Sequence, residues 1–113
     1  MAKVIDATNG REVASIPIAA GPDAVIYDAR RKLAFIPCGG DGILEVISLA
    51  DSAHPSAVQH VKTQPGSRTG TLDPASGKLY LMASEPDPTG KPAANGRGVA
   101  RVPGSYQVLV VSP

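Results

Sequence analysis

The segment GPDAVIYD at residues 21–28 returns 45 residues later as GSRTGTLD at residues 66–73, so the chain contains an internal repeat. After a one-residue insertion, KLAFI at residues 32–36 lies over KLYLM at residues 78–82. Each segment is short, rich in apolar residues and bounded by turn residues, which is typical of β-strands. A period of this length that holds several strands is the period of a four-stranded β-propeller blade.

Weaker matches extend the repeat in both directions. Upstream, residues 13 and 16 lie over residues 58 and 61, and residues 4–6 lie over residues 46–48 at a spacing of 42. Downstream, residues 108–111 fit the third-strand position after a long insertion. With the strands of one unit lettered a to d, we expect a single partial domain over residues 1–113, made of strands c–d at 3–18, a blade a–b–c–d at 22–64, and a blade a–b–c at 67–113 with a b–c loop at 85–104.

Turn residues divide the chain into nine expected strands. Gly (12 residues) and Pro (11 residues) are frequent, and no stretch has a helical period. Asn9-Gly10 predicts a type I′ hairpin turn, and residues 39–42 predict a β-turn. The strands are expected near residues 3–8, 11–18, 24–28, 32–38, 43–49, 57–63, 68–73, 78–83 and 105–111.

Two other architectures have a similar spacing of elements. A β-sandwich also places short strands every 8 to 12 residues, but it does not require the recurrence at 45 residues. A helical repeat of this length is excluded by the Gly and Pro inside each unit. We therefore expect an all-β protein with about two four-stranded antiparallel propeller blades per chain.

The two stretches VIDATNGREVASIPIAAGPDAVIYDARRKLAFIPCGGDGILEVISL and KTQPGSRTGTLDPASGKLYLMAS resemble the YVTN-type β-propeller repeat family. This bacterial family is related to lactonase-like and NHL-type propellers, and its architecture is WD40-like. The resemblance covers nearly the whole chain except residues 85–104, and it implies a fold more than a function. Relatives close a ring of about seven blades, so this chain looks like the C-terminal third of a full-length member.

Charge and composition bear on the partners. The formal net charge is +1, and no run of like charge is longer than Arg30-Arg31-Lys32, so a nucleic-acid surface is not expected. No apolar stretch has the length of a signal peptide or a membrane span. Localisation stays open, because full-length relatives are often exported.

Few residues have the chemistry of a site. His54 and His60 are six positions apart without a third ligand nearby, so we expect surface or partly buried structural histidines. The single cysteine, Cys38, is expected to be a small buried core residue. No catalytic, metal or cofactor motif is present, and the polar candidates at strand ends are Asp23, Asp41, His54, His60 and Arg68.

Two further features are local. Asp28 and Asp73 recur at equivalent positions before tight turns, where each carboxylate is expected to accept backbone N–H groups. The insertion at residues 85–104 is expected to be a mobile surface loop. Such a loop either takes part in recognition or is a disordered decoration of the fold without a role in binding.

The expected core follows from the strand pattern, although a slip of one residue would reverse the buried face of a strand. It consists of Val25, Tyr27, Leu33, Phe35, Leu44, Val46, Val58, Leu72, Leu79, Leu81, Val108 and Val110.

The sequence favours a non-enzymatic binding or scaffold module whose ligand is unknown. The alternatives are a fragment of a lactonase-like or cofactor-bearing propeller enzyme, with any site shared between chains, and an inert fragment. The expected partner is the chain itself. Residues 11–18 of one copy would complete the final blade of another and displace residues 3–8, which gives a cyclic trimer of six blades or a tetramer of eight.

Overall fold

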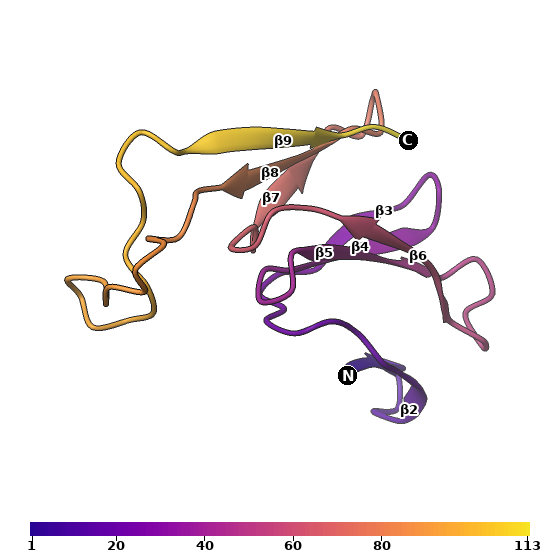
Figure 1. The fold of residues 1–113 in the computed structure, drawn as a ribbon. Coiled ribbons are helices and arrows are strands. Elements are labelled where there is room, and N and C mark those ends of the chain that lie inside the picture. Colours follow the sequence, from indigo (N-terminus) through magenta and orange to yellow (C-terminus); the bar gives the residue numbers. More distant parts are fainter.

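The computed structural model describes residues 1–113, and it contains nine strands and no helix (Figure 1). Accordingly, no helix is long and apolar enough to cross a membrane. All nine expected strands are confirmed, with ends that differ by at most three residues. The strands are β1 (Ala2–Ile5), β2 (Glu12–Ile16), β3 (Ile26–Asp28), β4 (Leu33–Cys38), β5 (Ile43–Ser48), β6 (Ser56–Lys62), β7 (Gly70–Leu72), β8 (Leu79–Ala83) and β9 (Gln107–Val111).

The strands form three separate antiparallel sheets. Their orders are β1-β2, β3-β4-β5-β6 and β7-β8-β9, and each sheet is a meander of consecutive strands. Figure 1 shows the three sheets following one another along the chain. The expected all-β class and the grouping of strands into two, four and three are therefore confirmed.

The repeat keeps its spacing of 45 residues through the β3–β4 and β7–β8 hairpins. Tyr27 pairs with Ala34 in the first hairpin, and Leu72 pairs with Leu79 in the second. Ala34 is thus equivalent to Leu79, and the predicted one-residue insertion is wrong. The prediction matched Lys32 with Lys78 by identity, whereas the backbone conformation shows that Lys32 corresponds to the glycine before Lys78.

A shared β-bulge confirms the upstream part of the repeat. The register of β1–β2 shifts after Val4, and the register of β5–β6 shifts after Val46. The residues that the two shifts leave without a partner are Val13 and Val58. Val4 and Val46 are 42 residues apart, and Val13 and Val58 are 45 residues apart, which are the expected spacings. The β1–β2 pair therefore corresponds to the β5–β6 pair.

Two apolar layers hold the sheets together. The first lies between β1–β2 and the β3–β6 sheet, and the second lies between the β3–β6 sheet and the β7–β9 sheet. The buried members of the first are Ile16, Ala34, Ile36, Cys38 and Ile47; those of the second are Phe35, Leu44, Val46, Leu79 and Leu81.

The two layers are built from equivalent positions. In the first layer Val4 and Ile16 lie against Ala34 and Ile36, and in the second their equivalents Val46 and Val61 lie against Leu79 and Leu81. We call the face that carries Val4 or Val46 the front of its sheet, and the face that carries Ala34 or Leu79 the back. In both layers the front of one sheet packs on the back of the next sheet along the chain.

Seven of the twelve expected core residues lie in the second layer, either buried or packed against its buried members. The other five are exposed, so their assignment is wrong: Val25, Tyr27, Val58, Val108 and Val110. Val58 is the bulge residue of β6, and Val25 precedes β3. In β9 the alternation is reversed, because Leu109 and Val111 face the core instead of Val108 and Val110.

Aspartates close several turns. Asp28 accepts the backbone N–H of Arg30 (2.9 Å) and Asp73 accepts that of Ala75 (3.0 Å), which confirms the expected role of both. The expected turn after β4 is confirmed by a bond from Gly42 N to Cys38 O (3.0 Å). The β1–β2 hairpin is not type I′, because only Gly10 of its turn pair has a positive φ (73°).

The insertion at residues 85–104 folds back on itself. Asp87 N donates to Ala100 O (2.7 Å), and Ala93 N donates to Gly98 O (3.0 Å). Isolated bridges join Pro86 to Arg101 and Pro92 to Val99. The two halves of the insertion therefore pair with each other through backbone hydrogen bonds, so the insertion is an ordered loop rather than a disordered decoration.

Candidate functional site

The polar candidates from the sequence do not meet in one site. Asp23 is exposed before β3, and Asp41 accepts the N–H of Ala20 (2.7 Å). His54 bonds Asp51 through Nδ1 (2.8 Å) in an exposed turn. His60 projects from β6 with its side chain 61% exposed. The fifth candidate, Arg68, lies at the start of the third sheet and lines a separate cleft.

Cys38 is fully buried at the end of β4, which confirms it as a core residue. Burial raises the pKa of its thiol, and the negative charges of Glu45 and Asp41 raise it further. A nucleophilic cysteine needs the opposite conditions, because the thiolate is the reactive form. This residue therefore serves packing.

Glu45 was not singled out from the sequence, although it is a buried carboxylate. Its Oε1 accepts the N–H of Ala19 (2.9 Å), and its Oε2 contacts Nδ1 of His60. The contacts tie the segment after β2 to the sheet edge at β6. The available signal was one acidic residue inside the otherwise apolar strand ILEVIS.

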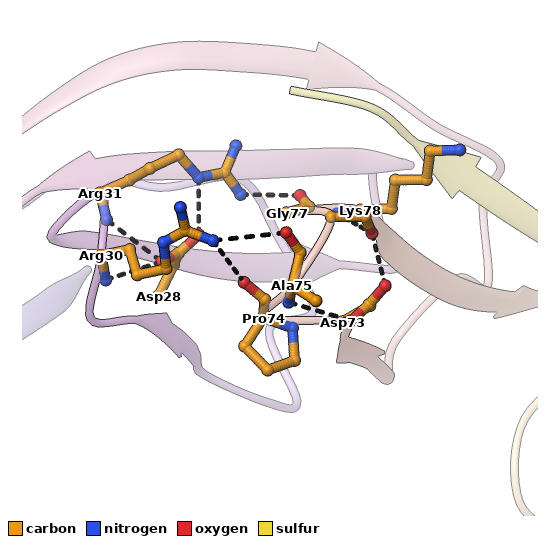
Figure 2. A network of polar contacts seen from close by, with 9 residues as sticks. Asp28, Arg30, Arg31, Asp73, Pro74, Ala75, Gly77 and Lys78 are labelled. Carbon is orange, nitrogen blue, oxygen red and sulfur yellow. Dashed lines mark hydrogen bonds and ion pairs between the residues drawn. The ribbon is translucent and has the colours of Figure 1, made fainter.

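Two arginines join the second sheet to the third (Figure 2). Arg31 Nε donates to the carboxylate of Asp28 (2.6 Å), and its Nη2 reaches Gly77 O (2.8 Å). Arg30 Nη1 donates to the carbonyls of residues 74–75 (3.2 and 3.3 Å). The hydrogen bonds from Arg31 lower the pKa of Asp28. The network is a structural clamp between two hairpins.

The third sheet has an open edge and an open apolar face. β9 pairs only with β8, so its other edge has no strand beside it. Val108 and Val110 are 58% and 54% exposed on the face away from the second layer. Their equivalents on β5, Leu44 and Val46, are buried in the second layer, under the third sheet. The third sheet thus exposes to solvent the face whose equivalent in the second sheet is buried.

A groove of about 800 Å³ runs beside β9. It is lined by residues 61–65, which follow from the end of β6, and by residues 108–112.

The opposite end of the molecule has a complementary apolar surface. A cavity of about 560 Å³ is lined by β1, by residues 22–25 before β3 and by the second sheet, and most of its lining is apolar. Ala34, Ile36 and Ile47 form its floor, on the side of the sheet opposite Leu44 and Val46. The same chain therefore has one uncovered apolar face, on the third sheet, and one apolar face, on the second sheet, that only the two strands β1 and β2 cover.

No family model, no curated protein and no solved structure matches this chain. Its candidate site is consequently defined by its own geometry.

Proposed function

We propose that the chain is a non-enzymatic binding and scaffold module that assembles with copies of itself into a closed propeller-type ring. The observation that carries this proposal is the front-to-back stacking of equivalent sheets, with the front of the third sheet left uncovered and the back of the second sheet covered by two strands only. Such head-to-tail contacts form rings when the rotation closes.

The stacking favours a propeller over a sandwich. Two sheets of a sandwich share one core, and each turns its inner face toward the other. Here the same operation relates the first sheet to the second and the second to the third. The first strands of the second and third sheets, β3 and β7, also contact each other (Figure 1), which is expected of strands that line the channel of a propeller.

The missing strand of the third sheet is supplied by β2 of a neighbouring copy. Within one chain, β2 pairs Ile16 with Ala2 and Ala14 with Val4. The β9 residues equivalent to Ala2 and Val4 are Val108 and Val110. β9 of one copy can therefore replace β1 beside the β2 of the next, and β1 is displaced.

This exchange improves the apolar contact. Val108 replaces the smaller Ala2 over the floor of the 560 Å³ cavity. Tyr80 is equivalent to the buried Phe35 and would enter the same space. Val108 and Val110 are 58% and 54% exposed, so covering each contributes about 1 kcal/mol, roughly half the value for a fully exposed valine. The new β9–β2 pairing takes the place of the short β1–β2 pairing.

The solution mass of the full chain tests the proposal. Multi-angle light scattering at micromolar concentration is expected to report a trimer or tetramer of the 11.5 kDa chain. Val110→Lys places a charge on the proposed contact and is expected to give monomers. Val58→Lys is the matched control, because Val58 is equally exposed at 55% but lies on the bulge of β6. A stable, folded monomer of the unmodified chain would overturn the assembly.

A further inference from the structure

A cleft of about 720 Å³ lies between the insertion and the start of the third sheet. Three arginines line it, together with a tyrosine, an asparagine and the small or apolar residues Ala93, Ala94, Gly98, Val99 and Ala100. No acidic residue contributes to the lining. The side chains with hydrogen-bonding groups are Arg68, Asn95, Arg97, Arg101 and Tyr106.

The positive charge of this cleft is not compensated within the chain. The four ion pairs of the structure involve Lys3, Arg31, His54 and His60, and none involves an arginine of the cleft. In a chain with a formal net charge of only +1, three unpaired guanidinium groups are thus concentrated in one hollow. A concave site of one charge sign raises the local concentration of counter-ions.

Arg101 contacts two segments beside the cleft. Its Nη1 donates to Ser84 O (3.3 Å), and its guanidinium group lies over Gly66. A Cβ atom at Gly66 would lie 2.8 Å from both terminal nitrogens, so the guanidinium group would have to move if another residue replaced this glycine. Gly66 also has a φ of 90°, which favours glycine.

The other two arginines lie next to glycines. The Cγ of Arg68 lies 2.5 Å from where a Cβ of Gly39 would be, so the side-chain stem packs on bare backbone. Arg97 is at the tip of the insertion, between Gly96 and Gly98, which have φ of 70° and 71°. Its own N–H donates to Asn95 Oδ1 (2.9 Å).

We propose that this cleft binds a small oxyanion with two or more negative charges, in the form of a phosphate group or of neighbouring carboxylates. A guanidinium group presents a planar set of donors that matches either kind of oxyanion. Tyr106 adds an exposed ring and a hydroxyl group. The volume suits a small molecule. All the residues come from one chain, so the site does not depend on assembly.

Titration of the full chain with two defined anions tests the site. Inorganic phosphate and citrate are added separately at constant ionic strength, with acetate as the singly charged comparison, and amide chemical shifts are followed by NMR. At least one of the two is expected to bind more tightly than acetate and to shift the amides of residues 95–101. Binding of phosphate alone identifies a phosphate group as the ligand chemistry, and binding of citrate alone identifies a polycarboxylate.

Substitutions localise the effect. Arg68→Gln and Arg97→Gln are each expected to weaken binding about tenfold, because each removes charge-assisted hydrogen bonds to the anion while glutamine keeps the first carbons of an exposed side chain. Arg11→Gln is the control, since Arg11 is exposed outside the cleft. Neither anion binding better than acetate, or Arg11→Gln weakening binding as much, would overturn the proposal. Light scattering on the same samples separates a failed assembly from a failed site.

Discussion

Lys32 and Gly77 occupy the same position in two successive hairpins, and both have a left-handed backbone, with φ of 53° and 75°. Lys32 is the single non-glycine residue of the chain with a positive φ. The turn geometry is therefore repeated although the residue type is not. In the first hairpin a side chain is kept in a conformation that L-residues disfavour.

Lys32→Gly is expected to raise the free energy of unfolding by about 0.5–1 kcal/mol, because glycine removes this strain at a smaller entropic cost. Urea denaturation followed by circular dichroism measures the change. Ala29→Gly in the same hairpin is the control, since Ala29 has no positive φ and the substitution adds only chain entropy. A loss of stability in Lys32→Gly would contradict the argument.

Phe35→Ala is expected to lower the free energy of unfolding by about 3–5 kcal/mol. Phe35 is 5% exposed in the second apolar layer, and the guanidinium carbon of Arg31 lies 5.3 Å from its ring centroid. The control is Tyr27→Ala on β3, because Tyr27 is 53% exposed and its loss should cost far less. Equal effects of the two substitutions in chemical denaturation would show that Phe35 is not a core residue.

The turn aspartates predict a loss of stability in acid. Hydrogen bonds to five carboxylates lower their pKa: Asp6, Asp28, Asp51, Asp73 and Asp87. A carboxyl group with a pKa lower in the folded than in the unfolded state stabilises the fold above its unfolded pKa, about 4, and this contribution disappears as the pH falls through the folded pKa.

The pH dependence is tested on one turn. Asp73→Asn is expected to reduce the slope of stability between about pH 4 and pH 2, measured by urea denaturation at several pH values. The matched substitution Asp23→Asn should leave the slope unchanged, because no hydrogen bond reaches the Asp23 side chain in the structure. An unchanged slope in Asp73→Asn would contradict the assignment of acid sensitivity to this turn.

The purified chain is expected to hydrolyse neither lactones nor esters above the background rate. Cys38 is buried with a raised thiol pKa, and Nδ1 of each histidine is engaged by a carboxylate. Release of nitrophenol from nitrophenyl acetate and ring opening of butyrolactone measure the activity. Turnover that Cys38→Ala, His54→Ala or His60→Ala abolished would favour the enzymatic alternative instead.

The strands and their grouping were predictable because both depend on local patterns. Alternating apolar residues and turn residues mark each strand, and the spacing of repeated segments assigns the strands to sheets. The buried face of β9 was not predictable, because Val-Leu-Val-Val has no polar side that identifies the solvent face. The alignment of β4 with its equivalent β8 was predicted one residue off, because it matched Lys32 with Lys78 by identity, whereas the turn conformation matches Lys32 with Gly77.

The proposed anion cleft was only partly accessible from the sequence. Arg68 stood out at the start of a strand, but Arg97 and Arg101 lie in a Gly- and Pro-rich insertion whose path is set by its own backbone pairing. Arg68 and Arg101 make close contacts over Gly39 and Gly66, respectively. Such contacts join segments far apart in the chain and leave no periodic signal.

The clamp in Figure 2 affects how the repeat can change during evolution. Arg30 and Arg31 bind main-chain carbonyls of the neighbouring hairpin, and every residue type provides a carbonyl. Mutations at residues 74–76 can therefore accumulate without breaking the bonds between the sheets, whereas the two arginines and Gly77 cannot be replaced freely. The contact between the sheets therefore constrains mainly the β3–β4 hairpin, which supplies the two arginines. The sequence of the β7–β8 turn can diverge while the two hairpins keep their relative position.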